Sequence, residues 1–230
     1  MLFLDQTVRN RPGSASGGDP LARAASAKTQ TRIQKEKTEL ILSAALEVFA
    51  SYGFRGTTID QIAAEAGLSK PNLLYYFDSK DAIHEQLLED LLDTWLDPLR
   101  SLDAEGDPVD EITSYVIRKL EMARDFPRES RLFANEILQG APRIMDQIAG
   151  PLRELVAEKA AIITGWADAG RIAPVDPYHL IFSIWATTQH YADFDIQVAV
   201  VLGKRADQRF EDAAAYLTNL FTKVLRPSEG

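Results

Sequence analysis

The sequence contains no cysteine, so it can form neither a disulfide framework nor a thiolate metal site. Its only histidines are His84, His179 and His190, and they show none of the spacings typical of metal ligands, such as His-x-x-x-His. No glycine-rich loop that would cradle phosphates is present. We therefore expect no catalytic residues, no metal and no cofactor, and an enzyme remains only an alternative.

Long apolar runs are missing as well. No stretch of 18 apolar residues exists, which argues against a membrane-spanning helix. The opening residues, MLFLDQTVRNR, have too short an apolar run for a signal peptide. A cytoplasmic protein without membrane contact is therefore expected. No segment alternates apolar and polar residues as a strand would, so the pattern predicts an all-α protein of about nine helices.

Positive charge is scarce overall, because the net charge is −9. Its distribution is uneven: residues 1–80 hold 10 basic and 8 acidic residues, whereas residues 81–230 hold 15 and 26. The segment 1–37 alone holds 7 basic and 3 acidic residues. A nucleic-acid partner is therefore compatible with the N-terminal part, and the acidic remainder should face away from it.

The first 30 residues are dominated by small and polar residues, including RPGSASGGDP, and should not bury enough apolar surface to order themselves. We interpret residues 1–37 as a flexible basic tail and the start of the first helix. Two interpretations of the tail stay open. It is either an inert extension or a basic arm that adds phosphate or minor-groove contacts.

The stretch Thr57–Phe77 reads as two short helices joined by a tight turn. Thr58 is placed to cap the first helix, with Gln61 three residues on to complete a capping box. Gly67 follows where a left-handed residue ends a helix at little cost. Ser69 then offers a second N-cap. This order predicts a helix-turn-helix, and an ordinary helical hairpin is the alternative.

The second short helix has two different faces. Its apolar face is formed by Leu73, Leu74 and Phe77 at helical spacing. Pro71, which is tolerated only in a first helical turn, points outward with Asn72 and Tyr75. A short helix with such a polar outer face suits insertion into the major groove of DNA.

The residues on either side of Thr57–Phe77 favour the helix-turn-helix over an ordinary helical hairpin. The stretch FASYGFRGTTIDQIAAEAGLSKPNLLYYFDSKDAI resembles the DNA-binding domain of the TetR family of transcriptional regulators. The resemblance implies a three-helix DNA-binding domain, placed here at 38–84, and a helical ligand-binding and dimerisation domain at 85–230. It also implies a homodimer on a palindromic double-stranded operator, and phosphate contacts from Tyr75 and Lys80.

The residues themselves suggest further DNA contacts. Asn72 is the best base reader, because its amide can pair with adenine N6 and N7. Lys70 can reach a base edge or a phosphate, and Pro71 departs from the small or hydroxylated residue usual at its position. Tyr76 is expected either at the DNA or packed against the first helix. The full set of candidate DNA-binding residues is Thr57, Thr58, Ser69, Lys70, Pro71, Asn72, Tyr75, Tyr76 and Lys80.

Apolar periodicity and breaking residues place the helices along the chain. They are expected at about 33–52, 58–66, 70–76, 79–101, 109–125, 128–139, 142–169, 176–193 and 207–225. The long helix 142–169 should bend near Gly150–Pro151. The family resemblance suggests a dimer formed through 176–193 and 207–225, and the last helix carries an apolar stripe that needs a partner surface. The stripe consists of Leu217, Leu220, Phe221 and Val224.

Polar residues crowd onto an otherwise apolar helix at 187–193. Buried polar groups cost free energy unless they are paired, so the cluster predicts a dimer interface or a small polar ligand. Aromatic residues on other helices can close the same cavity, although each tryptophan taken singly is equally well a core residue. The candidate ligand-binding residues are Trp95, Phe133, Asn135, Trp166, Trp185, Gln189, Tyr191 and Asp193.

The segment IITGWADAGRIAPVDPYHLIFSIWATTQHYADF resembles regulators of pyrimidine utilisation within the TetR family. This resemblance implies a repressor that uracil or thymine releases from DNA. On that basis, Gln189 can match one edge of the ring and Asp193 can accept from a ring N–H, while Trp95 or Trp185 stacks on its face. The alternatives are a TetR-type regulator of another metabolite and a helical interaction module without DNA binding.

Overall fold

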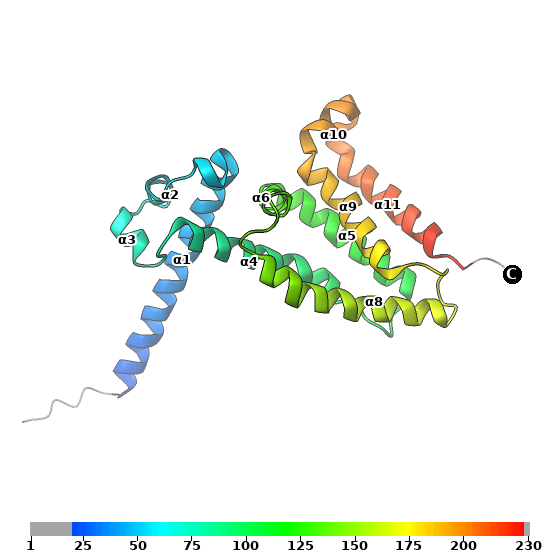
Figure 1. Cartoon of the computed structure of the whole chain (residues 1–230), viewed down its shortest axis with the longest axis horizontal. Coiled ribbons are helices and arrows are strands. Elements are labelled where there is room, and N and C mark those ends of the chain that lie inside the picture. The colour runs from blue at the N-terminus through cyan, green and yellow to red at the C-terminus, as the bar shows by residue number, and fades with distance from the viewer. Residues whose placement is uncertain (1–19, 228–230) are drawn as a thin grey trace, which may run out of the picture. The chain divides into compact units, whose positions relative to one another are not determined.

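The computed structural model describes residues 20–227, with side chains from residue 32 onward. Within this range the chain divides between Leu40 and Ile41 into two units. Every regular element in the described range is helical, which confirms the all-α class (Figure 1). The helices are α1 Pro20–Gly56, α2 Ile59–Glu65, α3 Lys70–Leu74, α4 Lys80–Arg100, α5 Pro108–Asp125, α6 Pro127–Leu138, α7 Met145–Gln147, α8 Arg153–Asp168, α9 Pro177–Asp193, α10 Asp195–Leu202 and α11 Arg209–Leu225.

The first helix begins at Pro20 rather than near Ile33, where the sequence pattern placed its start. Proline suits the first turn of a helix, and the alanine-rich residues that follow have high helix propensity, which explains the earlier start. Further along, exposed ion pairs four residues apart join Arg32 to Glu36 and Lys35 to Glu39. Residues 1–19, which hold much of the predicted basic tail, lie outside the described part of the chain.

Two glycines divide the helix-turn-helix region as predicted. Gly53 has a φ of +67° and interrupts α1, and Gly67 has a φ of +64° directly after α2. A side chain in this left-handed region is strained, so glycine is the residue of lowest cost at both points. The chain can therefore turn sharply twice within a short distance and bring α2 and α3 together.

The helix-turn-helix shares a core with the region around α6. Its central side chains include Phe49 of α1, Ile62 of α2 and Leu73 of α3, all of them buried. Leu132 of α6 and Ile144 belong to the same cluster of buried residues. Burying an aliphatic or aromatic side chain contributes roughly 1.5–3 kcal/mol. The DNA-reading helices are thus packed, through this core, against the segment that follows α6.

A second core lies among α4, α5, α8, α9 and α11, where α5 packs against both α9 and α11 (Figure 1). Helix α4 contributes to both cores, through Ile83 and Leu88 to the first and through Leu99 to the second. This long helix therefore connects the two cores.

The structure refines two stretches of the C-terminal part. The helix expected at 142–169 is divided into α7, a π-helical turn at Ile148–Leu152 and α8. Pro151 lies inside that turn, and its missing N–H and its ring prevent regular α-helical bonding there. Helix α10 was not expected at all. Its near-continuous apolar run, DIQVAVVL, has no helical periodicity, which explains why the pattern failed to indicate it.

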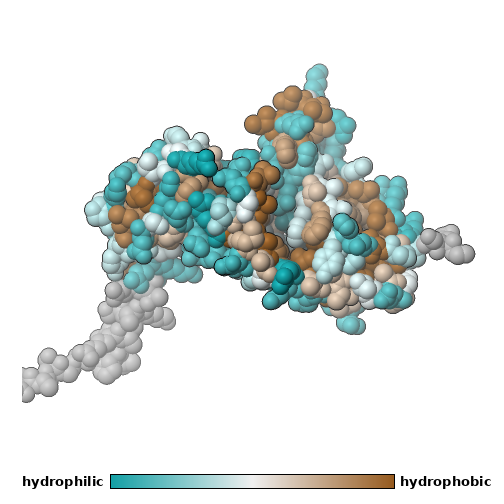
Figure 2. Space-filling model, in the orientation of Figure 1, coloured by the Kyte–Doolittle hydropathy of each residue, from teal (hydrophilic) through white to brown (hydrophobic). Residues whose placement is uncertain are grey.

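Helix α10 exposes an unusual amount of apolar surface. Ile196, Val200 and Val201 are 81%, 75% and 78% exposed, and Figure 2 shows hydrophobic surface over this part of the chain. Such a patch is typical of an interaction surface. Within the described residues, no helix has the length and apolar character needed to cross a membrane.

Candidate functional site

The turn between α2 and α3 is built from the predicted caps. The Thr58 hydroxyl accepts from the backbone N–H of Gln61, whose side chain accepts in return from the Thr58 backbone N–H. The Ser69 hydroxyl accepts from the backbone N–H of Asn72 at 3.4 Å, and Pro71 lies in the first turn of α3. These local bonds fix the direction in which α3 leaves the turn.

The outer face of α3 is open to solvent. Lys70, Pro71, Asn72 and Tyr75 are exposed, and the Tyr75 side chain is 70% exposed. The Lys70 ammonium pairs with the Asp60 carboxylate at 2.8 Å, an exposed pair that a phosphate could displace at little cost. This face can therefore present an amide, an ammonium and a phenol to a DNA groove. One detail differs from expectation, since Leu74 is 37% exposed rather than inward.

Two of the predicted phosphate contacts, Thr57 and Lys80, also make hydrogen bonds within the chain. Thr57 is buried, and its hydroxyl donates to the Gly53 carbonyl at 2.8 Å, so it has no free hydroxyl at the surface. The Lys80 ammonium donates to the carbonyls of Phe54 at 2.8 Å and Thr57 at 2.7 Å. The Phe54 carbonyl also accepts from the Thr57 backbone N–H at 3.4 Å, and Lys80 adds a donor to it and to the Thr57 carbonyl just beyond α1. Its main contribution in the structure is to tie the start of α4 to the end of α1.

The remaining candidates of this set are divided between the surface and the core. Thr58 and Ser69 are exposed, but their hydroxyls serve as helix caps. Tyr76 is half-buried against the core of the helix-turn-helix, and its ring meets that of Tyr75 edge to face with centroids 5.1 Å apart. Tyr76 thus braces the exposed Tyr75, which agrees with the packing alternative.

A cavity of about 450 Å³ lies in the C-terminal part of the chain. Its size falls within the range of small-molecule sites, and its lining is mostly apolar with few polar groups, as such sites require. Four of the predicted ligand-binding residues line it together: Trp95, Phe133, Trp185 and Gln189. The rings of Trp95 and Phe133 lie 5.7 Å apart between centroids, at an angle of 50°.

The polar groups of this cavity come from α9 and α5. Among the described residues, the Gln189 amide makes no hydrogen bond, so its donor and acceptor remain available to a ligand. The Trp185 indole N–H is already engaged, because it donates to the Tyr115 hydroxyl at 2.7 Å. Trp185 therefore offers its ring rather than its N–H.

Lys119 lines the cavity as well, although the sequence pattern did not single it out. It is 5% exposed and holds its ammonium 4.8 Å from the centroid of the Trp95 ring. Burial lowers the pKa of Lys119 to about 8, and the nearby Asp193 carboxylate opposes this shift. A signal did exist: Lys119 follows Ile112 and Val116 on the apolar face of α5, where a lone lysine is unusual.

Four predicted ligand-binding residues lie outside this cavity. Trp166 is buried in the second core and donates to the Ala104 carbonyl at 2.9 Å. Tyr191 is half-buried, with its ring 6.1 Å from that of Phe210. Asn135 lies on the face of α6 that lines a different cavity.

Asp193 is the fourth. Its carboxylate accepts a bond from the Ser130 hydroxyl at 2.5 Å and does not line the cavity. Burial raises the pKa of Asp193, and the Ser130 bond and the charges of Arg131, His190 and Lys119 act against that shift. Asp193 is therefore close enough to influence the pKa of Lys119 without being part of the cavity wall.

The wall of the cavity is also connected to the helix-turn-helix. Residues from Ile137 to Ile148 supply five of its lining residues, and Arg143 lies in the same segment. The Arg143 guanidinium bonds Glu136 at 3.1 Å and Asp81 at 3.2 Å, and its centre lies 3.6 Å from the centroid of the Phe54 ring. Since Asp81 begins α4 and Phe54 lies near the end of α1, one side chain joins the cavity wall to the DNA-reading region.

A capped helix-turn-helix with a polar outer face, joined to a helical region with an internal cavity, defines a helix-turn-helix transcriptional regulator. The sequence pattern of bacterial regulatory proteins of the tetR family matches residues 41–87, and that of the C-terminal region of YcdC-like proteins matches residues 88–228. The chain belongs to the TetR family of DNA-binding transcriptional regulators. It is a regulator and not an enzyme.

Individual relatives agree with this assignment. The chain is 46% identical over 200 residues to the HTH-type transcriptional regulator RutR of Escherichia coli K12, covering 86% of this chain and 94% of RutR. It is 28% identical over 177 residues to the regulator HbdR of Aromatoleum sp. strain CIB, covering 73% of this chain and 76% of HbdR.

Among solved structures, Salmonella enterica GusR has a TM-score of 0.58 at 21% identity, covering 83% of this chain and 95% of GusR. A TetR-like transcriptional regulator from Rhodococcus sp. RHA1 has a TM-score of 0.59 at 20% identity, covering 81% of this chain and 93% of that one. At these identities the likeness concerns the fold alone.

Proposed function

We propose that this regulator is a homodimeric repressor that leaves a palindromic operator when uracil or thymine occupies the cavity lined by Trp95, Lys119, Trp185 and Gln189. The observation that carries the proposal is the combination of aromatic walls with one unpaired amide and one buried ammonium. The resemblance of 162–194 to regulators of pyrimidine utilisation supports the ligand class.

The chemistry of the cavity suits a pyrimidine. A uracil ring is flat and carries two N–H donors and two carbonyl acceptors, so one edge can pair with both atoms of the Gln189 amide. The Lys119 ammonium can donate to a ring carbonyl, a charge-assisted bond that a dry site strengthens. The rings of Trp95 and Trp185 can cover the faces of the pyrimidine. In this proposal Lys119, rather than Asp193, makes the second polar contact with the pyrimidine ring.

A route from the cavity to DNA is available through two connections. Helix α4 carries Trp95 in the cavity and Lys80 at its beginning, where Lys80 holds the end of α1. The segment that carries Arg143 supplies the second connection. A ligand that repositions the cavity wall would move α3 through both, and the two reading helices of a dimer must match half-sites roughly 34–36 Å apart or a multiple of that distance.

Thermodynamic linkage limits the size of the effect. A ligand weakens DNA binding only as far as it prefers the non-binding conformation. A coupling of about 1–3 kcal/mol, which is typical of allosteric proteins, corresponds to about a 5- to 150-fold change in operator affinity. We expect uracil to act within this range.

Calorimetry on the purified protein tests the ligand assignment, with uracil, thymine and cytosine as ligands at millimolar concentration. Uracil and thymine should bind with one site per chain, and cytosine should bind more weakly because it presents a different donor and acceptor pattern at one edge. An absence of heat with uracil and with thymine would rule out the pyrimidine assignment. The TetR-family assignment does not depend on that result.

The buried ammonium of Lys119 favours one specific alternative, a TetR-type regulator of an acidic metabolite. A carboxylate in the cavity would pair with Lys119 and remove the cost of its burial. Orotate, a pyrimidine that carries a carboxylate, separates the two cases. Tighter binding of orotate than of uracil would favour an acidic effector.

A further inference from the structure

A second cavity of about 580 Å³ lies between the end of α1 and helix α6. Its walls come from 49–55 of α1, from His84 of α4 and from one face of α6. None of its lining residues lines the first cavity, although α6 contributes to both. The volume lies within the range of small-molecule sites, so the second cavity is large enough for a ligand of its own.

The lining combines aromatic surface with an excess of positive charge. Arg55, Arg128 and Arg131 line this cavity, whereas Glu136 is its only acidic lining residue. Glu136 is 2% exposed and already satisfied, because Arg143 bonds it through its guanidinium at 3.1 Å and its backbone N–H at 2.9 Å. Glu136 therefore does not neutralise the three arginines.

Two of these arginines keep donors for a ligand. Arg128 forms an ion pair with Glu47, and that carboxylate largely neutralises its charge. Arg131 donates to the Ala192 carbonyl at 3.1 Å, and among the described residues no carboxylate lies within 4 Å of its guanidinium. Arg55 is exposed and has no ion pair within the described part of the chain. A guanidinium has five N–H donors, so Arg55 and Arg131 can both bind an anionic oxygen.

The aromatic side chains define the other half of the ligand. The Tyr52 side chain lines the cavity and is 61% exposed, which leaves its ring free for stacking. The Phe54 ring lies close to the cations of Lys80, at 4.3 Å, and Arg143, at 3.6 Å, so a ligand meets it mainly at an edge. Leu132 adds apolar surface from α6.

His84 contributes no charge of its own. It is 3% exposed, and its ring packs edge to face against Phe49 and Phe54 at centroid distances of 4.7 and 4.8 Å. Burial, reinforced by the charge of Arg143, lowers the pKa of His84 to about 4, so the imidazole is neutral at pH 7. The positive potential of the cavity is therefore that of its arginines and persists at neutral pH.

We propose that this second cavity is a binding site for a small aromatic carboxylate, with the ring against Tyr52 and Leu132 and the carboxylate on Arg55 and Arg131. Guanidinium groups match the geometry of a carboxylate, and an aromatic ring matches the apolar wall. The amides of Asn135 and Gln139, which also line the cavity, can add hydrogen bonds. The proposal does not depend on the pyrimidine assignment of the first cavity.

The test is calorimetry on the full-length chain with 1-naphthoate as the probe and 1-naphthamide as its neutral counterpart. Naphthoate should bind once per chain, and naphthamide should bind at least about tenfold more weakly, because it lacks the charge that the arginines recognise. Equal binding of the two probes, or no binding of naphthoate, would overturn the proposal.

Substitutions of the lining arginines test whether 1-naphthoate binds in the second cavity. Arg131→Gln and Arg55→Gln should each weaken naphthoate binding about tenfold, the loss expected for one charge-assisted bond. Among the described residues Arg55 makes no ion pair, so its variant is informative even if Arg131→Gln destabilises the fold. Arg153→Gln, an exposed arginine of α8 outside both cavities, is the matched control and should bind as the wild type does. Unchanged affinity in Arg55→Gln and Arg131→Gln would contradict the proposal.

Lys119→Met separates the two cavities, because Lys119 lines only the first. Naphthoate should bind this variant with unchanged affinity, and saturating uracil should not displace naphthoate from the wild type. Loss of naphthoate binding in Lys119→Met would place the probe in the first cavity and refute a second site.

Discussion

The guanidinium of Arg143 lies 3.6 Å from the centroid of the Phe54 ring, although the two residues belong to different regions of the chain. A cation over an aromatic face contributes about 0.5–2 kcal/mol, depending on how far it is desolvated. Arg143 also bonds Glu136 and Asp81. One arginine therefore touches α6, the start of α4 and the end of α1, and it belongs to the segment that walls the first cavity.

The first prediction concerns this link. Arg143→Met combined with Glu136→Gln should retain uracil binding and operator binding. In this double variant, however, uracil should lower operator affinity by less than about threefold, a weaker coupling than in the wild type. The second substitution is needed because Glu136, 2% exposed, would otherwise be left buried with an unpaired charge. Operator affinity is measured by fluorescence anisotropy with and without uracil.

Glu136→Gln alone is the matched control, because it keeps the Arg143 guanidinium over Phe54. It should release DNA as the wild type does. If the double variant responded to uracil as fully as this control, Arg143 would have no part in the coupling.

The second prediction concerns recognition in the first cavity. Gln189→Leu keeps similar bulk but loses both amide contacts, and Lys119→Met loses the ammonium while keeping the apolar stem. Each should weaken uracil binding by about tenfold or more and leave operator affinity unchanged. Thr187→Val is a suitable control on α9, since its hydroxyl bonds only carbonyls of its own helix. Calorimetry and anisotropy on the same preparations give both quantities, and wild-type uracil affinity in both variants would exclude this cavity.

The third prediction is a pH dependence of stability that originates in His84. The pKa of His84 is about 4 in the folded chain and about 6.5 when unfolded, so below pH 6.5 the unfolded chain binds more protons. The stabilisation is complete above pH 6.5 and is lost as the pH falls through 4. His84→Phe, which suits the Phe49 and Phe54 rings, should remove about one proton from the pH slope of unfolding in that interval.

Urea unfolding of wild type and variant at several pH values between 4 and 7 measures this difference directly. Both proteins share their carboxylates, so the acid lability common to the two cancels in the comparison. An identical slope in both would show that His84 titrates alike in the folded and unfolded chain.

The fourth prediction distinguishes base recognition by Asn72 from the structural contribution of Lys80 in the helix-turn-helix region. Asn72→Ala should relax base preference at one position per half-site, at a cost of about 1–3 kcal/mol in discrimination. Lys80→Ala should lower the melting temperature, because the Thr57 carbonyl loses its donor and the Phe54 carbonyl loses the shorter of its two hydrogen bonds. Operator variants and thermal melts separate the two effects. A Lys80→Ala protein that melts as the wild type does, with a smaller salt slope, would restore Lys80 as a simple phosphate contact.

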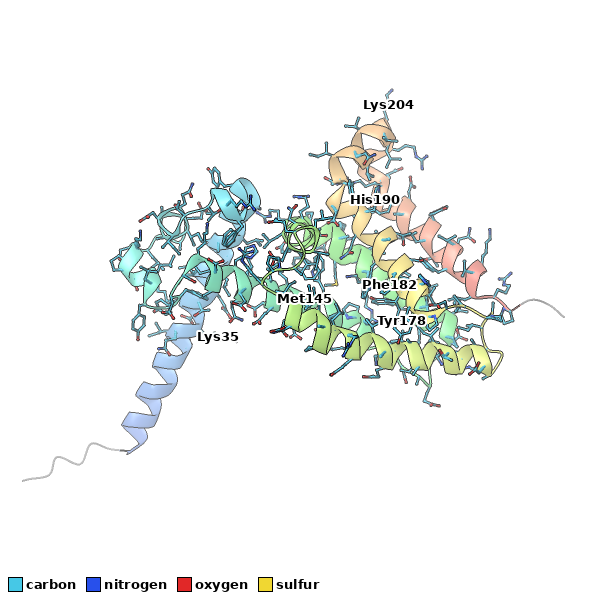
Figure 3. The ribbon with its side chains drawn as sticks, in the orientation of Figure 1. Lys35, Met145, Tyr178, Phe182, His190 and Lys204 are labelled. Carbon is cyan, nitrogen blue, oxygen red and sulfur yellow. The ribbon has the colours of Figure 1, made fainter. Side chains whose placement is uncertain are left out.

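The fifth prediction concerns the proposed dimer. The apolar stripe predicted on the last helix is partly used within the chain, since Leu217 and Phe221 are buried in the second core. Tyr178 and Phe182 of α9 remain 44% and 46% exposed, and Val224 of α11 is 45% exposed; Figure 3 labels the two aromatic residues on α9. Phe182→Glu with Val224→Asp should therefore yield monomers in light scattering.

Tyr52→Glu is the control for that experiment, because it also adds a charge at an exposed aromatic position but lies in α1. It should remain dimeric. A Phe182→Glu, Val224→Asp protein that still scatters as a dimer would place the interface elsewhere, and the exposed apolar surface of α10 would be the next surface to test.

Features that depend on neighbours in sequence were predictable. The caps at Thr58 and Ser69 and the turn glycines follow from local backbone chemistry, and they appear where the sequence places them. Trp95, Phe133 and Trp185 were also assigned to one cavity, because each lies on the apolar face of its helix.

Features that depend on how one helix is rotated against another could not be predicted from the sequence. Asn135 and Phe133 are two residues apart on α6, yet they line different cavities. The bonds from Lys80 to the carbonyls of Phe54 and Thr57 span more than twenty residues, so no local pattern indicates them, and its phosphate contact stays a prediction. Lys119 was missed because only the packed structure reveals that its ammonium faces a cavity.

Helix α6 is only twelve residues long and supplies a wall to each of two cavities. If one occupant displaces this helix, the affinity of the other cavity for its ligand changes, even though the two ligands do not compete for one site. By reciprocity, whatever factor the first molecule imposes on the affinity of the second is returned unchanged when the order of binding is reversed. In that case the operator affinity of one chain would depend on the concentrations of two different ligands. One would be a pyrimidine bound in the first cavity, and the other an aromatic carboxylate bound in the second.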